Sequence, residues 1–210
     1  MKKNNILFIL FLGTLWGASE AILGGALYQL GVPRASILLA IIAFAVLTLA
    51  REYRPQVGMA TLLAIVAVVY KALGMLAARN HPIFLCHCWG VLTLGVSYDV
   101  MRLVWKDRHD RLFAITASYL GYGLFAVTMT YIFRYSYWYQ VGVSKVLDHI
   151  LIAGTITAAG SAIVVPSAAY FARALKAKQL WPFAVPSKLA TGITSLLVVV
   201  LWILDLGVSF

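Results

Sequence analysis

The sequence contains few charged residues. Lys, Arg, Asp and Glu make up 11% of its 210 residues, whereas 62% are hydrophobic. Soluble domains are about one quarter charged and about one half apolar. A soluble fold of this length could not hide so much apolar surface from water, so the composition indicates a protein that is solvated by lipid.

The sequence also lacks the motifs of several function classes. It has no HExxH-type metal motif, no nucleophile with a base at a suitable spacing and no glycine loop that would cradle a phosphate. An enzyme is therefore the less favoured class, and an intramembrane enzyme acting on a lipid is the form it would take. No stretch is polar enough to form a soluble basic face, so the net charge of +10 does not indicate nucleic-acid binding.

Cysteine is scarce as well. Cys86 and Cys88 are too close in sequence for an ordinary disulfide, and on a helix they would point about 200° apart. Cys86, His87 and Cys88 cannot face one metal ion from consecutive helical positions. We expect both cysteines to act as small apolar packing residues and predict no metal site.

Long apolar runs, by contrast, are abundant. A helix needs roughly 20 apolar residues to cross a bilayer. The runs that meet or approach this length are 6–30, 35–50, 57–77, 82–105, 112–134, 146–171 and 188–208. We therefore expect an all-α fold, a polytopic transmembrane helical bundle of seven spans that forms a single domain over residues 1–210. The run 35–50 is the shortest, so six spans are the alternative.

The basic residues between these runs predict the orientation of the chain. With Met1 inside, twelve of them fall on the cytoplasmic side: Lys2, Lys3, Arg51, Arg54, Arg102, Lys106, Arg108, Arg111, Arg173, Lys176, Lys178 and Lys188. The opposite side receives four: Arg34, Arg79, Arg134 and Lys145. Cytoplasmic loops carry such an excess of Lys and Arg. The N-terminus is thus expected inside and the C-terminus outside.

The first run contains a ridge of small residues, each four positions after the last. Its members are Gly13, Gly17, Ala21 and Gly25. Such a ridge lets another helix approach closely. The partner could be a helix of the same bundle, for example the sixth span with Ala153, Thr157 and Ser161, or a separate membrane subunit that docks there.

Two ionisable residues are predicted deep in the membrane. Glu20 in the first span and Lys71 in the third each lie about fourteen residues from the inner end, or about 21 Å along the helix. An unpaired charge at this depth is costly, and such residues are functional candidates. The alternatives are a structural ion pair between the two helices, a ligand-binding role, and a Lys71 side chain that extends outward by itself.

Further polar residues converge near the outer side. They are His87 in the fourth span, Asp148 and His149 at the start of the sixth, Arg134 at the end of the fifth and Asp205 in the seventh. Together with Glu20 and Lys71 they predict an outward-opening cavity. His87 and His149 are also the one pair that suits b-type haem, a weaker alternative for which two scattered histidines are the only signal. The aromatic segment 135–139 is interpreted as an interfacial belt, and stacking of an aromatic ligand there is the alternative.

The segment Gly13-Thr14-Leu15-Trp16-Gly17-Ala18-Ser19-Glu20-Ala21-Ile22-Leu23-Gly24 carries a family resemblance. It is followed by Gly31 and Pro33, the stretch Arg51 to Pro55, Lys71 and Pro82. This pattern over the first 100 or so residues resembles small prokaryotic membrane proteins that look like the substrate-binding (S) components of energy-coupling factor transporters. The resemblance implies a prokaryotic plasma membrane and capture of a vitamin, its precursor or a metal ion from outside. It also implies docking onto a transmembrane subunit through Gly13, Gly17, Ala21 and Gly25.

The function predicted first is a solute-binding component of an uptake transporter, which captures a small polar nutrient from the outer side. Its binding residues would be Glu20, Lys71, His87, Asp148 and His149, and no cofactor is predicted. The expected partners are the lipid bilayer, other membrane subunits and the small-molecule solute. The alternative is a non-catalytic membrane subunit of a larger complex, with haem held by His87 and His149.

Overall fold

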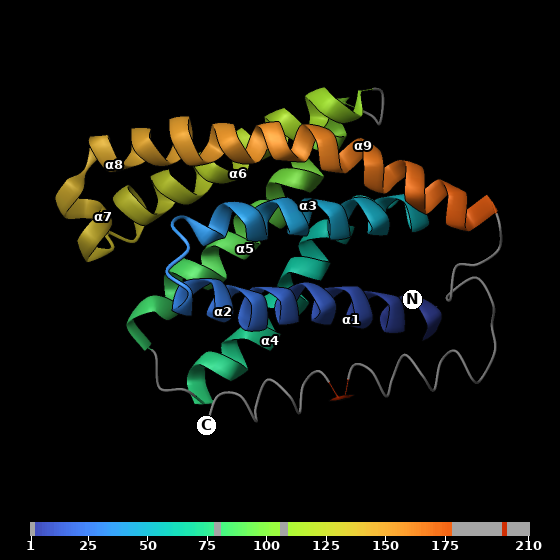
Figure 1. Cartoon of the computed structure of the whole chain (residues 1–210), viewed down its shortest axis with the longest axis horizontal. Coiled ribbons are helices and arrows are strands. Elements are labelled where there is room, and N and C mark those ends of the chain that lie inside the picture. The colour runs from blue at the N-terminus through green and yellow to red at the C-terminus, as the bar shows by residue number, and fades with distance from the viewer. Residues whose placement is uncertain (1–2, 78–80, 106–108, 178–198, 201–210) are drawn as a thin grey trace.

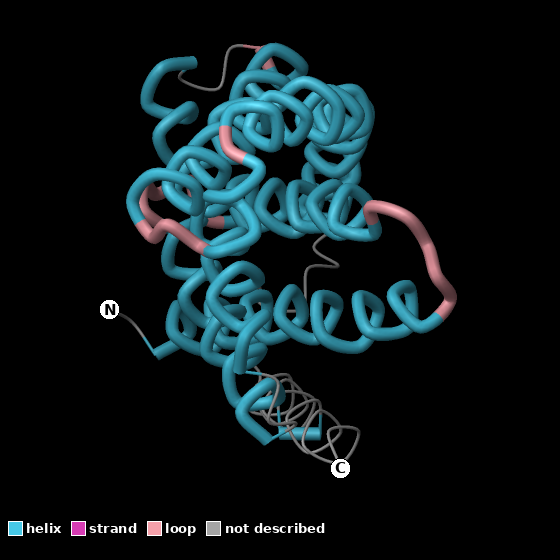
Figure 2. The backbone as a smooth tube through the Cα atoms, turned by 90° about the vertical axis from the view of Figure 1, so that its left-hand side faces the viewer, coloured by secondary structure: helices cyan, strands magenta, loops and turns pink. Residues whose placement is uncertain are grey.

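The computed structural model describes residues 3–77, 81–105, 109–177 and 199–200, and in these ranges the regular secondary structure is entirely helical (Figures 1 and 2). The longer α-helices are α1 Lys3–Ala18, α3 Ala35–Tyr53, α4 Met59–Ala77, α5 His81–Trp105, α6 Asp110–Val127 and α9 Thr155–Ala177. The short ones are α2 Gly24–Gln29, α7 Ser136–Val141 and α8 Val143–Asp148. Three π-helical turns connect them: η1 Ser19–Leu23, η2 Thr128–Ile132 and η3 His149–Gly154.

Helices occupy the first six predicted spans, which confirms the all-helical class. The uncertain second run is α3, a helix of 19 residues. Within the described residues, four helical segments are long and apolar enough to cross a membrane: Ile6–Gln29, Ala35–Tyr53, Asp110–Ile132 and Val143–Ala177. Met59–Leu73 is a shorter apolar helix. These segments are consistent with an integral membrane protein in contact with lipid. The seventh predicted span, 188–208, with Asp205, lies outside the described residues apart from 199–200.

The helices form a closed bundle. Along the ring α1 packs on α4, α4 on α5, α5 on α6, α6 on α9 and α9 on α3, and α3 returns to contact α1 and α4 (Figure 1). Large side chains fill the centre, and Trp16, Phe44, Tyr70 and Tyr98 are fully buried. The longer helices bury one face inside the bundle and expose apolar side chains elsewhere, for example Leu38 of α3, Leu62 of α4 and Ile163 of α9, as expected for helices in lipid.

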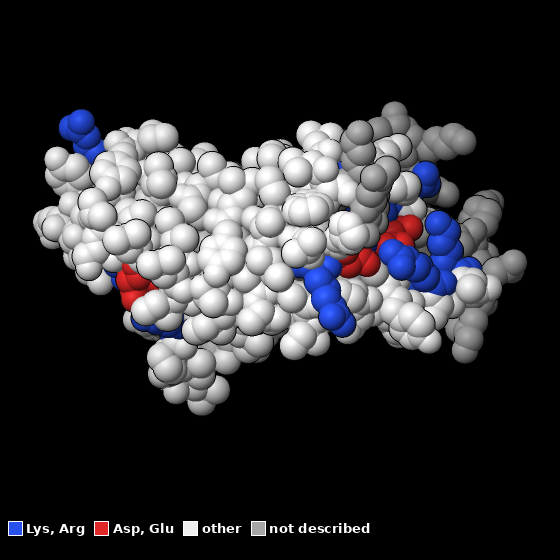
Figure 3. Space-filling view, turned by 90° about the horizontal axis from the view of Figure 1, so that it is seen from above, with Lys and Arg blue, Asp and Glu red and all other residues white. Residues whose placement is uncertain are grey.

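Charged side chains gather toward the two ends of the bundle. At one end Arg34 pairs with Asp148, and at the other Arg51 pairs with Asp110. We call these the Arg34 end and the Arg51 end. Figure 3 shows an uncharged stretch between them on the face that it displays. Such a band between charged ends is consistent with helices that cross a bilayer, while the orientation of the bundle in a membrane stays a prediction.

Near the Arg51 end, Asp99 connects α5 to the first turn of α4. This α5 carboxylate accepts hydrogen bonds from the backbone N–H and the hydroxyl of Thr61, at 2.8 and 2.7 Å, and from the N–H of Ala60 at 3.4 Å. These N–H groups belong to the first turn of α4, where no partner exists within the helix. A carboxylate also suits the positive end of the helix dipole. Asp99 therefore caps α4 from a neighbouring helix.

The small-residue ridge lies largely inside the bundle. A methyl group added at Gly13 would lie 2.6 Å from Cβ of Val66, and one at Gly17 would lie 2.8 Å from Cβ of Tyr70. Both glycines allow α1 to approach α4. Because α4 covers them, these two glycines pack inside the bundle, and docking of another subunit through the ridge stays a prediction. The rest of the ridge differs, since Ala21 is half-buried and Gly25 faces open space.

Candidate functional site

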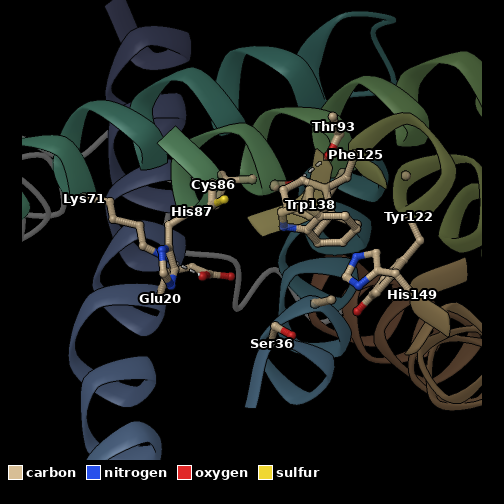
Figure 4. A pocket seen from close by; sticks show the side chains of 15 residues that line it. Glu20, Ser36, Lys71, Cys86, His87, Thr93, Tyr122, Phe125, Trp138 and His149 are labelled. Carbon is tan, nitrogen blue, oxygen red and sulfur yellow. Dashed lines mark hydrogen bonds and ion pairs between the residues drawn. The ribbon is translucent and has the colours of Figure 1, made fainter. Parts of the chain in front are cut away.

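A cavity of about 270 Å³ lies between the helices in the half of the bundle nearer the Arg34 end (Figure 4). Its walls come from η1, α3, α4, α5, α6, α7 and η3. They comprise Glu20, Ser36, Ala40, Lys71, Cys86, His87, Gly90, Val91, Thr93, Leu94, Gly121, Tyr122, Phe125, Trp138 and His149. Ser36 and His87 line the cavity and are also exposed on the bundle surface. The cavity therefore opens onto the surface of the bundle beside these two residues.

An ion pair forms one wall. Nζ of Lys71 donates a hydrogen bond of 2.8 Å to Oε2 of Glu20. The Lys71 and Glu20 side chains are only 6% and 9% exposed. Both residues therefore form a structural pair, as one interpretation of the sequence predicts, and both also face the cavity. In the described part of the chain, Glu20 is the hydrogen-bond acceptor of the Lys71 ammonium group, which retains capacity for further acceptors.

Aromatic rings form the opposite wall. The His149 imidazole lies 4.8 Å from the Tyr122 ring, 5.2 Å from Phe125 and 4.9 Å from Trp138, between ring centroids. The Trp138 ring meets Phe125 edge-on at 5.2 Å. These distances lie in the range of favourable aromatic contacts. The rings come from α6, α7 and η3, so the wall exists only when three separate segments pack together.

Two of the three π-helical turns carry cavity residues. Glu20 lies in η1, and His149 opens η3. A π-turn inserts an extra residue into an α-helix and is rare, but it occurs frequently at functional sites. Each turn changes the direction in which the following side chains project. The π-helical backbone is an observation separate from the cavity. It occurs at Glu20, which lies in the wall with the ion pair, and at His149, which lies in the aromatic wall.

The predicted binding residues are not all brought together. Glu20, Lys71, His87 and His149 line the cavity, whereas Asp148 does not. An oxygen of Asp148 lies 3.2 Å from Nη2 of Arg34, and the two side chains are 39% and 44% exposed. Neighbouring helical residues project about 100° apart. Because His149 turns inward, Asp148 turns to the surface and lies outside the lining of this cavity.

Sequence reasoning did not identify which aromatic side chains belong to the site. In the segment 135–139, Trp138 is buried, whereas Tyr137 and Tyr139 are exposed. The belt interpretation therefore suits the two tyrosines and fails for Trp138. Nothing in a run of alternating aromatics distinguishes its one inward-facing member. Tyr122 and Phe125 were equally hidden among the apolar residues of a predicted span.

The described residues contain no group of three or more His, Cys, Asp and Glu side chains that could hold a metal ion. His87 and His149, the predicted alternative haem ligands, do line the same cavity. Figure 4 shows them apart, His87 beside Lys71 and Glu20, and His149 among the aromatic rings. Cys86 also lines the cavity, whereas Cys88 is buried outside the lining.

No protein-family model, curated protein or solved structure matches this chain, so the site is interpreted from its own geometry. The fold and the cavity define a helical bundle with features of an integral membrane protein and a partly polar pocket that opens to its surface.

Proposed function

We propose that the protein is a membrane-embedded solute-binding component of an uptake system, which captures a small polar nutrient from the outer side of the membrane. The cavity supports this proposal most directly. It combines a buried ion pair with an aromatic wall, and it opens beside Ser36 and His87. Ligand sites have this character, being mostly apolar with a few convergent polar groups.

The predicted orientation puts the mouth of the cavity on the outer side. The basic-residue asymmetry places the Arg51 end in the cytoplasm and the Arg34 end outside. The chain has no nucleotide-binding motif of its own, so ATP-driven uptake would require partner subunits. The ridge residues that are not fully buried follow α1: Ala21 in η1 is half-buried, and Gly25 in α2 is exposed. Contact with a partner would fall on this part of the helix and its exposed apolar face.

The test starts with the full-length protein purified from its native membrane, followed by mass spectrometry of the small molecules that it releases. Binding of the released solute is then measured for the wild type, Glu20→Gln and Lys71→Met. We expect at least a ten-fold loss of affinity in both variants, because each removes one polar partner from the cavity wall. Asp148→Asn is the matched control, since it removes a charge at the same end but outside the cavity. Wild-type affinity in both cavity variants, with the fold intact, would contradict the proposal.

The alternative is a membrane subunit that binds haem through His87 and His149. The position of both histidines on one cavity favours it. The volume disfavours it, because 270 Å³ lies below the range of about 300–1,000 Å³ that holds drug-sized ligands, and haem is larger than these. An absorption spectrum of the same purified protein distinguishes the solute-binding component from the haem-binding subunit. A Soret band that disappears in His87→Ala or His149→Ala would establish the haem protein.

A further inference from the structure

Among the described residues that line it, the cavity carries no net formal charge when its histidines are neutral. Glu20 and Lys71 are the acidic and the basic residue of this lining and their charges cancel, while Asp148 lies outside it beside Arg34. A buried charge without a counter-charge is strongly unfavourable. A singly charged ligand would add such a charge, or would take one partner from the ion pair and leave the other unpaired. A ligand with no net charge has neither cost.

The remaining hydrogen-bonding capacity of the ion pair determines which polar groups fit. A lysine ammonium has three donors, and a carboxylate has about four acceptor positions. One donor and one acceptor are joined in the 2.8 Å bond between Lys71 and Glu20. A neutral group with an adjacent acceptor and donor, as in an amide, can therefore bond to Lys71 and Glu20 together. The ion pair stays intact when such a group binds.

The wall opposite the ion pair favours a flat ring. Phe125 and Trp138 meet edge-on, and His149 lies against both (Figure 4). Aromatic partners gain about 0.5–1.5 kcal/mol beyond the burial of their area when they stack or meet edge to face. A saturated ring of the same size would bury similar area without this gain. The volume of 270 Å³ further restricts the ligand to a molecule smaller than a typical drug.

We propose that the solute is a small, electrically neutral molecule with a planar aromatic ring and an amide-like edge. The ring lies against Phe125, Trp138 and His149, and the edge bonds to Glu20 and Lys71. This inference rests on the proposed function, because it specifies what the same cavity binds. Two opposite walls of the cavity support the inference. The wall with the Glu20–Lys71 pair favours a neutral ligand, and the aromatic wall favours a planar one.

Four probes of nearly equal size separate these requirements. Benzamide is planar and neutral, benzoate is its anionic counterpart, benzamidine is cationic at neutral pH, and cyclohexanecarboxamide is neutral but not planar. Their affinities are measured by equilibrium dialysis against the purified full-length protein in lipid nanodiscs. We expect benzamide to bind at least ten-fold more tightly than benzoate and benzamidine, and several-fold more tightly than cyclohexanecarboxamide.

Variants then locate the bound probe. Trp138→Ala should weaken benzamide binding at least ten-fold, and Trp138→Phe should restore part of it, because a ring is retained. Tyr137→Ala is the control, since it removes an exposed ring from the same short helix. Unfolding curves for the three variants show whether the bundle is intact.

Each contrary result has a definite meaning. Equal or tighter binding of either charged probe overturns the neutrality requirement, and equal binding of cyclohexanecarboxamide overturns the planarity requirement. Binding of none of the four at millimolar concentration overturns the inference as a whole. If the protein instead releases a charged native solute whose binding depends on Lys71, the proposed function stands and the ligand class is wrong. If neither a probe nor a native solute binds, both proposals fail.

Discussion

The two ends of the bundle use buried charge in different ways. At the Arg51 end, Arg51 bonds to both Glu52 and Asp110, at 2.9 and 2.7 Å, and Glu52 also accepts a bond of 2.8 Å from Arg173. The Arg173 side chain is 60% exposed, so this network continues to the surface. Nearer the Arg34 end, Glu20 and Lys71 form one pair, and both side chains are less than 10% exposed.

The difference indicates separate roles for the two groups. In the Arg51 network each charge has more than one partner, and the residues join α3, α6 and α9. Such redundancy suits a structural fastening near the membrane surface. The Glu20–Lys71 pair joins two helices by one bond and borders a cavity, which leaves capacity for a ligand. The contacts therefore support a stabilising role for both groups of charges, and the binding role of the Glu20–Lys71 pair stays a proposal.

The largest expected effect comes from breaking the lone pair. Glu20→Ala leaves the Lys71 ammonium buried without its partner, and breaking a buried pair costs about 3–5 kcal/mol. Asp110→Ala should cost less, because Arg51 keeps Glu52. The free energy of unfolding, measured in one detergent for both variants, tests this order. A larger loss of unfolding free energy in Asp110→Ala than in Glu20→Ala would contradict the expected order of the two charge groups.

A double variant separates stability from binding. Replacing both members of the pair, as in Glu20→Met with Lys71→Met, leaves no unpaired charge. Such replacements are often neutral or stabilising. We expect stability to return to at least the wild-type level, while solute binding stays lost. A double variant that unfolds as readily as Glu20→Ala would show that the single substitution acts by something other than the unpaired lysine.

An intermediate effect is expected where α1 meets α4. Gly17→Ala places a methyl group 2.8 Å from Cβ of Tyr70 and 3.0 Å from the Ala67 carbonyl oxygen, so the two helices must move apart. Overpacking of this kind costs about 1–3 kcal/mol. The same movement would stretch the Glu20–Lys71 bond, because these residues lie on the two segments that separate.

Gly25→Ala is the matched control for Gly17→Ala, because its added methyl group meets nothing within 4 Å. Alanine is also the better helix former, by about 0.8–1 kcal/mol. We expect the melting temperature to fall in Gly17→Ala and to hold or rise in Gly25→Ala. Equal destabilisation of the two would show that α1 and α4 are not in close contact at Gly17.

The smallest effect is expected at the exposed ion pair. Asp148→Asn removes the partner of Arg34, but both side chains are more than one third exposed. Exposed pairs contribute about 0.2–1 kcal/mol, less as salt rises. Unfolding measured at low and high salt should show a small loss at low salt that disappears at high salt. A loss as large as that of Glu20→Ala would mean that Asp148 is buried in the membrane form of the protein.

Several of these features could be predicted from the sequence, because they depend on periodicity and length alone. The apolar runs located six described helices, including the short run 35–50, which the structure contains as α3. Equal distances from the ends of two spans placed Glu20 and Lys71 at one depth. The pairing itself could not be predicted, because depth does not reveal which helices are neighbours. For the same reason, the sequence could not show that Gly13 and Gly17 pack against α4.

The amino-acid sequence by itself determined that this chain forms apolar helices, carries few charges and holds two of them deep in its helices, since composition and spacing are local properties. Only the tertiary structure decided that α4 covers the small residues of α1, that His149 faces inward while Asp148 faces out, and that Trp138 closes an aromatic wall. Each of these outcomes depends on which helices pack together and on how the π-turns rotate their side chains. Those relations arise between segments far apart in the chain, and no local pattern encodes them.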